Sequence, residues 1–171
     1  AKTDPLTGVA NRLAFMQTLD DLWNKRKKFF VTFIDLDNLK YRNDHYGHAE
    51  GDRYIRYACN FISLHGLQDD KLYRLGGDEF VLISFQGTLD ELDQRLETIR
   101  NKFISTHQYN SDLIDSFSYG SVLMNSSESK TPSDLLGEAD QKMYLYKAAV
   151  KAAAREAYMS SNLNSKGISL S

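Results

Sequence analysis

Apolar residues recur along the chain at two spacings, and the change from one spacing to the other predicts the order of its elements. Helical spacing predicts four helices, which run from Asn11 to about Lys27, from about residue 54 to Gly66, over residues 89–103, and from residue 131 to about Tyr158. Short runs rich in Phe, Val and Ile predict strands, which cover residues 29–34, 71–75, 79–85 and 117–124. The Gly76-Gly77 pair between two of these strands permits a tight hairpin.

Without the two outer helices, the predicted order is strand, helix, strand, strand, helix, strand. This order is typical of the α+β ferredoxin-like fold, or split βαβ (βαββαβ), with an antiparallel central sheet and here a flanking helix at each end. The same core occurs in palm-type polymerases and nucleotide cyclases. Because its first and third strands lie side by side, Asp35 at the end of the first strand is expected near the hairpin at Asp78.

Composition indicates one ordinary globular domain. The chain has 171 residues, too few for two comfortable cores. A net charge of -2 gives no reason to expect binding to nucleic acid or to a membrane surface. The single Cys59 lies in a helical pattern, so neither a disulfide nor a thiol nucleophile is expected. We expect a cytoplasmic location, and leave open that a longer protein is anchored to the inner membrane by other regions.

Acidic residues follow two of the predicted strands. Asp35 and Asp37 end the run over residues 29–34, and Asp78 and Glu79 follow the glycine pair. Carboxylate oxygens are the ligands that Mg²⁺ prefers in proteins, and Mg²⁺ leaves coordination positions for substrate phosphates and water. An isolated acid at a strand end more often caps a turn, but four acids at matching strand ends predict a site for Mg²⁺, with Mn²⁺ as a substitute.

Residues 74–80 read Arg-Leu-Gly-Gly-Asp-Glu-Phe, and residues 35–52 carry a Lys, an Asn, a Gly-His pair and a Gly-Asp pair. With these residues at the expected offsets, the two stretches resemble the GGDEF family, the bacterial diguanylate cyclases that condense two GTP into cyclic di-GMP. Residues 4–12 resemble the opening motif of the family, which we interpret as a loop held by local hydrogen bonds. We predict a GGDEF domain over residues 1–158 and a flexible tail or linker over residues 159–171.

The resemblance implies a set of metal and catalytic residues. It names Asp35, the backbone carbonyl of Leu36 and Asp78 as metal ligands. It also implies that Asp78 assists deprotonation of the 3'-hydroxyl of GTP, that Glu79 is a second acid, and that Lys40 approaches the phosphates. Read alone, Lys40 would be a solvated surface charge.

Guanine recognition is implied for Asn43 and Asp52, with His48 near the nucleotide. A carboxylate accepts hydrogen bonds from the ring N–H and the exocyclic amine of guanine, and an amide both donates and accepts. His48 by itself is more often a buried hydrogen-bonding residue. The stretch that begins with Asn38 and Leu39 is expected to open a helix whose free N–H groups attract phosphate.

The last predicted helix carries cations on one face, at Lys147, Lys151 and Arg155. Family members usually have Lys followed by Arg four residues later, so Lys151 stands where an arginine is expected. Lysine keeps the charge and loses the bidentate fork. Phosphate contact through Lys147 is expected, whereas Lys151 is as readily a solvated lysine, and Arg155 is a weaker substitute.

Many family members carry Arg-x-x-Asp before the hairpin, where product binds and inhibits. Here Asp70 is present, but Leu67 occupies the place of the arginine. Leucine can neither clamp a phosphate nor stack on guanine as a guanidinium does. We therefore expect no strong product inhibition through this site.

The leading interpretation is a Mg²⁺-dependent diguanylate cyclase. Each chain would hold one GTP and half an active site, so that a homodimer is needed for catalysis. The sequence starts close to structured-looking segments and without Met, so we expect an upstream sensor or dimerisation region. A catalytically silent module that binds GTP or cyclic di-GMP is the first alternative, and a ferredoxin-like protein-interaction domain is the second.

Overall fold

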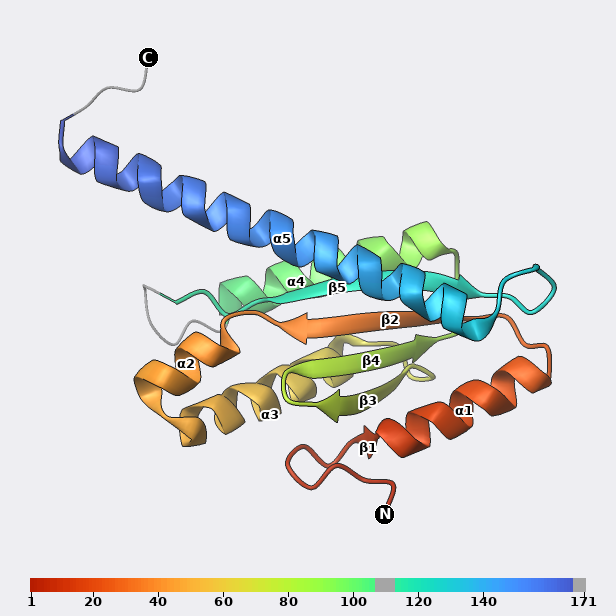
Figure 1. The fold of residues 1–171 in the computed structure, drawn as a ribbon. Coiled ribbons are helices and arrows are strands. Elements are labelled where there is room, and N and C mark those ends of the chain that lie inside the picture. The colour runs from red at the N-terminus through yellow and green to blue at the C-terminus, as the bar shows by residue number, and fades with distance from the viewer. Residues whose placement is uncertain (107–112, 168–171) are drawn as a thin grey trace.

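One sheet of five strands forms the centre of the computed structural model, which describes residues 1–106 and 113–167 (Figure 1). The strands are β1 (Ala10–Asn11), β2 (Phe29–Leu36), β3 (Lys71–Gly76), β4 (Glu79–Ser84) and β5 (Phe117–Met124). Their order in the sheet is β1-β3-β4-β2-β5. β2 is antiparallel to both β4 and β5, and β3 is antiparallel to β4. The four longer strands therefore confirm the predicted ferredoxin-like order, with the first and third predicted strands side by side.

The edge strand β1 was not predicted. It has two residues and runs parallel to β3, with Ala10 opposite Tyr73 and Asn11 opposite Arg74. A two-residue strand is too short to show any hydrophobic period. Its pairing brings the N-terminal loop beside the strand that leads into the hairpin.

Helices cover both faces of the sheet. They are α1 (Arg12–Asn24), α2 (Leu39–Tyr46), α3 (His48–His65), α4 (Leu89–Thr106) and α5 (Pro132–Ser165). Phe29 and Val31 of β2 pack in one cluster with residues of α1 and α5. Phe30 and Ile34 pack in the other cluster with residues of α3 and α4. Because β2 is buried on both sides, its sequence is a continuous apolar run and does not alternate.

The last helix is longer than the sequence predicted. α5 begins with the expected capping box at Thr131, but it continues to Ser165 and does not end near Tyr158. Residues 159–165, expected in a flexible tail, are therefore helical. The helix is rich in alanine over residues 148–157, and residues 138–166 contain neither glycine nor proline, so no residue stops the helix before Gly167. The outer part of α5 projects beyond the sheet (Figure 1).

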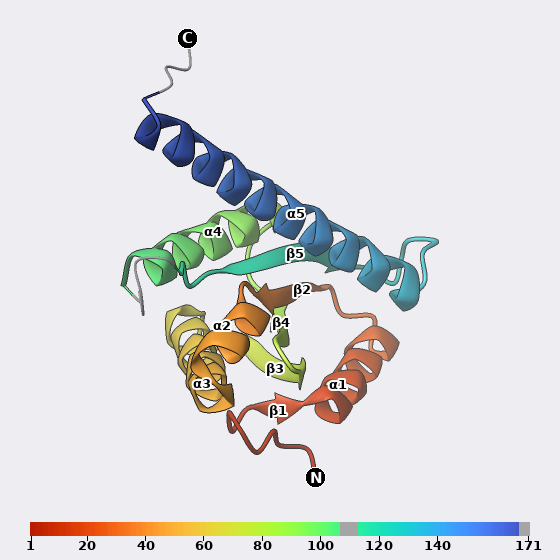
Figure 2. The same ribbon diagram turned by 60° about the vertical axis from the view of Figure 1, so that its left-hand side comes forward.

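Helix α2 lies at the end of the sheet where β2 points and packs beside α3 (Figures 1 and 2). Gly47 separates them with a φ of 87°, a left-handed conformation that favours glycine. The predicted opening of a helix after Asn38 is confirmed, because α2 starts at Leu39. In the part of the chain that the structure describes, no helix combines the length and apolar character needed to cross a bilayer.

Candidate active site

The predicted metal carboxylates meet at adjacent strand ends. Asp35 of β2 pairs with Glu79 of β4, and the Leu36 amide donates a hydrogen bond of 3.0 Å to the carbonyl of Asp78. The hairpin between β3 and β4 depends on Gly76 and Gly77, whose φ angles are 146° and 51°. The register of the sheet therefore brings Asp35 and Asp78 together as the sequence predicted.

Lys147 of α5 reaches this cluster from above the sheet. Its Nζ atom lies 2.8 Å from Oδ2 of Asp35 and 3.2 Å from the carbonyl oxygen of Leu36. It also lies 3.7 Å from Oδ1 of Asp37. A cation thus already contacts two of the three predicted metal ligands, so these oxygens form a place that suits positive charge.

Asp35 has an unusual environment for a carboxylate. Burial raises the pKa of Asp35 to about 7, although the hydrogen bond from Lys147 opposes this shift, and the nearby charge of Asp78 adds to it. Its Oδ1 atom is buried and has no hydrogen-bond partner. A buried carboxylate oxygen beside a second carboxylate is satisfied when a cation joins the pair.

The donor set suits a divalent metal ion that keeps part of its coordination shell for other ligands. Within residues 1–106 and 113–167, no three His, Cys, Asp or Glu side chains gather into a metal site. The predicted set has two carboxylates and the Leu36 carbonyl, and Mg²⁺ usually keeps several waters or substrate phosphates in its shell.

The Asp37 carboxylate is held by serine side chains and not by the strand ends that carry Asp35 and Asp78. Its buried carboxylate accepts hydrogen bonds of 2.6 Å from the Ser116 hydroxyl and 2.8 Å from the Ser118 hydroxyl. Both serines lie at or just before the start of β5. Asp37 therefore holds the end of β2 to β5, a role that its position in the acidic motif did not reveal.

Asn43 of α2 packs against the turn of α3 that carries Asp52. A Cβ atom added at Gly51 would overlap the Oδ1 atom of Asn43, so only glycine permits this approach. The same Oδ1 atom is buried and has no hydrogen-bond partner. The structure thus brings the two residues predicted to recognise guanine onto neighbouring helices.

Other predicted phosphate contacts remain at the surface. The Lys40 side chain is 91% exposed and pairs with Asp44 of the same helix at 2.9 Å. His48, Lys151 and Arg155 are exposed as well. Asn38 donates a hydrogen bond of 3.1 Å to the carbonyl of Ile114, next to the start of α2. The structure does not gather these side chains around Asp35.

The N-terminal loop is tied to the signature hairpin. Asp4 accepts hydrogen bonds from the amide and hydroxyl of Thr7, at 2.9 and 2.6 Å, which confirms the predicted local bonding. Arg74 donates to Asp4 at 3.1 Å and to the carbonyl of Gly77 at 2.9 Å. Burial opposes the change, but the bonds to Thr7 and the charge of Arg74 keep the pKa of Asp4 below its usual value.

The position matching the inhibitory motif is internally satisfied. Asp70 accepts a hydrogen bond from the Leu67 amide at 2.9 Å and pairs with Arg95 at 2.6 Å.

A cleft of about 380 Å³ opens beside Glu79 and is lined by Arg12, Phe33 and Met143. The cleft adjoins the carboxylates and lies between α1 and α5.

Sequence reasoning missed a buried arginine next to Asn43. Arg42 pairs with Asp115 and with Glu50, and nothing in the helical pattern of residues 38–46 distinguishes it from a solvated arginine. Hydrogen bonds from Arg53 and then from Arg42 hold the pKa of Glu50 below its usual value, although burial opposes them. The long motif implied a role for Asn43 but implied none for Arg42.

Comparison with known proteins is consistent with this geometry. The sequence matches the family described as "Diguanylate cyclase, GGDEF domain" over residues 1–153. It is 34% identical to diguanylate cyclase DgcN of Escherichia coli over 149 residues, which is 82% of this chain and 36% of that protein. It is 35% identical to diguanylate cyclase DgcS of Shewanella oneidensis over 156 residues, which is 87% of this chain and 50% of that protein.

A solved structure shows the same fold. The coiled coil and GGDEF domain of DgcB from Caulobacter crescentus, in complex with c-di-GMP, superposes with a TM-score of 0.78 at 26% identity. The match covers 86% of this chain and 81% of that one. By contrast, the chain spans only about a third to a half of the length of the two cyclases named above.

Proposed function

Because the chain belongs to the GGDEF family of diguanylate cyclases, we propose that it condenses two GTP into cyclic di-GMP and pyrophosphate. The observation that carries the proposal is the meeting of Asp35, the Leu36 carbonyl and Asp78 at one end of the sheet. The buried Oδ1 atom of Asp35 has no hydrogen-bond partner there. Mg²⁺ or Mn²⁺ held there would neutralise the triphosphate and acidify the attacking hydroxyl.

Lys147 has a second role in this proposal. Its ammonium group pairs with Asp35 and lies at the end of a flexible side chain. It can therefore move to a triphosphate that binds at the same end of the sheet. Asp78 accepts the proton of the 3'-hydroxyl, and Glu79 is the second acid of the hairpin. Lys40, Lys151, and the N–H groups at Asn38 and Leu39 are proposed to contact phosphate.

Guanine selection is assigned to Asn43 and Asp52, with His48 beside the nucleotide. The buried Oδ1 atom of Asn43 is an acceptor without a partner, and guanine offers N–H donors at its edge. Adenine lacks the ring N–H that a carboxylate such as Asp52 would accept. This difference supports GTP as the substrate.

A single chain would hold only half of the reaction. The 3'-hydroxyl of one GTP must attack the α-phosphate of another, so two domains are proposed to face each other as a homodimer. An upstream sensor or dimerisation region would then control the encounter. Leu67 and the pairing of Asp70 with Arg95 support the proposal that this site gives no strong product inhibition.

The first test is product formation. The protein is incubated with GTP and Mg²⁺ at high concentration, and again as a fusion to a dimerising coiled coil, and the products are separated by chromatography. Cyclic di-GMP from the parent, and none from Asp78→Ala, is the expected result.

A second candidate is a silent module that binds nucleotide without turnover. The contact of Lys147 with both Asp35 and Leu36 favours it, because the ammonium competes for the metal ligands. Measurable GTP binding with no product from the forced dimer would establish this candidate and reject the cyclase.

A further inference from the structure

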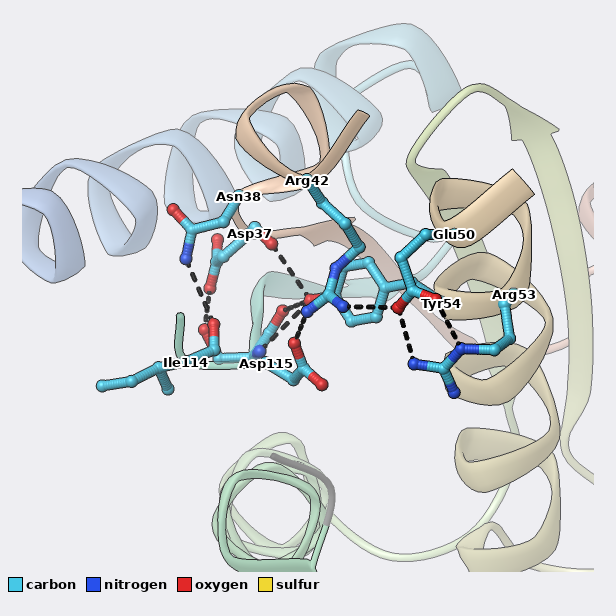
Figure 3. Close-up of polar contacts among 9 residues, drawn as sticks. Asp37, Asn38, Arg42, Glu50, Arg53, Tyr54, Ile114 and Asp115 are labelled. Atoms are coloured by element: carbon cyan, nitrogen blue, oxygen red, sulfur yellow. Dashed lines mark hydrogen bonds and ion pairs between the residues drawn. The ribbon is translucent and has the colours of Figure 1, made fainter. Parts of the chain in front are cut away.

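Arg42 is a fully buried cation with partners on three sides (Figure 3). Its side chain is 0% exposed, and its guanidinium pairs with Asp115 and with Glu50, the latter at 2.8 Å. The guanidinium carbon lies 4.2 Å from the centroid of the Tyr54 ring, within cation–π distance. Three segments of the chain, namely α2, α3 and the residues just before β5, therefore meet at one side chain.

These segments carry the proposed nucleotide-binding residues. Arg42 lies in α2, directly before Asn43, and Glu50 lies in the first turn of α3, two residues before Asp52. Asp115 lies just before β5. One guanidinium thus links both helices that read the base to the sheet.

Tyr54 extends the link to the metal end of β2. Its hydroxyl lies 3.0 Å from the Asp37 carbonyl and 2.9 Å from the Ser116 carbonyl, and it accepts a hydrogen bond of 3.2 Å from the Ser116 amide. Asp37 follows Asp35 by two residues. A continuous set of contacts therefore runs from Asn43 to the strand end that carries the metal ligands.

Stability alone does not account for such a group. Replacing a buried ion pair by well-packed apolar residues is often neutral or stabilising, because removing charges from water is costly. What an arginine adds is geometry, since its donors form a rigid planar fork that fixes the direction of each partner.

We propose that Arg42 is a positioning residue for GTP. It fixes α2 and α3 against the ends of β2 and β5, so that Asn43 and Asp52 hold guanine at a set distance from Asp35 and Asp78. Arg42 is buried and touches no reacting atom. The inference deepens the proposed function and depends on it for the identity of the nucleotide.

The test exchanges the buried pair for apolar residues. In Arg42→Met/Asp115→Leu both charges disappear together, and Glu50 keeps Arg53 as a partner at 2.6 Å. The fold is expected to survive, with a melting temperature near that of the parent. Arg53→Met is the matched control, because it removes an arginine that pairs with the same Glu50 but is 42% exposed.

Two readouts separate positioning from a merely structural role. KM for GTP is expected to rise about tenfold in the double variant with a smaller change in kcat, and the preference for GTP over ATP is expected to fall. Mn²⁺ affinity, measured by calorimetry without nucleotide, is expected to stay within about twofold. Arg42→Lys should show a smaller rise in KM, and Arg53→Met none.

The outcomes distinguish this inference from the proposed function. Parent-like KM and base preference in a folded double variant would show that Arg42 is only structural. If the double variant does not fold, the same comparison between Arg42→Lys and Arg53→Met decides, and equal KM values reject the proposal. If the parent makes no product, the affinity for a non-hydrolysable GTP analogue is measured in place of KM. A loss of affinity confined to the Arg42 variants would then reject the cyclase but retain the positioning role of Arg42. Failure of the parent to bind GTP would reject both.

Discussion

Two charged clusters at the same end of the sheet are built in opposite ways. At the carboxylates, Lys147 reaches Asp35 by a single flexible stem, and both side chains keep some exposure. Beside α2, Arg42 is wholly buried and contacts Asp115, Glu50 and the Tyr54 ring. The first cluster can exchange its cation, whereas the second cannot change without moving helices.

This difference matches the demands of the proposed reaction. A site that takes up metal and releases pyrophosphate needs partners that can be replaced, and an ammonium on a long stem meets that need. A site that recognises one base needs fixed distances between its hydrogen-bonding groups, and the planar guanidinium of an arginine fixes such distances.

The largest effect is expected from Asp78, which we propose as a metal ligand. Asp78→Ala should lower the rate of cyclic di-GMP formation by at least about 10³-fold, because metal stabilisation of developing charge contributes several kcal/mol. Product is quantified by chromatography, and circular dichroism checks the fold. Asp20→Ala, which removes an exposed aspartate of α1, should leave the rate unchanged, and equal losses in the two variants would refute the role of Asp78.

Single removal of each cation should affect stability very differently. Arg42→Ala should lower the free energy of unfolding by about 3–5 kcal/mol, because it removes the guanidinium that pairs with buried Asp115. Lys147→Ala should lower it by about 1 kcal/mol or less, because the pair with Asp35 is partly exposed and Asp35 can take up a proton. Urea unfolding at neutral pH measures both, and similar losses would remove the contrast.

Gly51 tests whether the contact between α3 and Asn43 of α2 is as close as described. Gly51→Ala should cost about 1–3 kcal/mol of stability and raise KM for GTP, because its Cβ would displace the Asn43 amide. Gly137→Ala is the matched control in another helix, where a Cβ meets nothing within 4 Å. That change should raise stability by up to about 1 kcal/mol, and a parent-like KM in Gly51→Ala would show that Asn43 does not need this position.

The smallest expected effect is a pH dependence. The folded protein raises the pKa of Asp35 from 3.8 to about 7, so it binds this proton more tightly than the unfolded chain does. The stability due to the protonated form is complete below about pH 4 and is lost as pH rises towards 7. With a chelator present, urea unfolding of the parent should lose about 1 kcal/mol or more over this range relative to Asp35→Asn. Parallel stability curves would contradict the raised pKa.

The fold and the meeting of the acidic strand ends were predictable because their signals are local. Strand runs, helical spacing and the Gly76-Gly77 pair indicate the order of elements, and this order brings Asp35 beside the hairpin. The structure places Asn43 and Asp52 on adjacent helices that are separated by Gly47, and their role in guanine recognition stays a prediction. Such features need no knowledge of distant contacts.

The partners of the charged side chains were not predictable in the same way. Arg42 and Asp115 are 73 residues apart, and Lys147 and Asp35 are 112 apart, so only the folded chain pairs them. The helical pattern around Arg42 is that of an ordinary polar helix. The length of α5 was underestimated because its last turns contain serine and asparagine, which weaken a helix signal without ending the helix.

The bond between the N-terminal loop and the hairpin also has a mechanical consequence. Arg74 donates hydrogen bonds from one nitrogen to Asp4 and from another to the carbonyl of Gly77, which directly precedes Asp78. Tension on the backbone ahead of Asp4 would therefore reach the tip of the hairpin by two routes, through the Arg74 guanidinium and through the pairing of β1 with β3. Movement of the N-terminal loop would thereby be coupled to the position of Asp78.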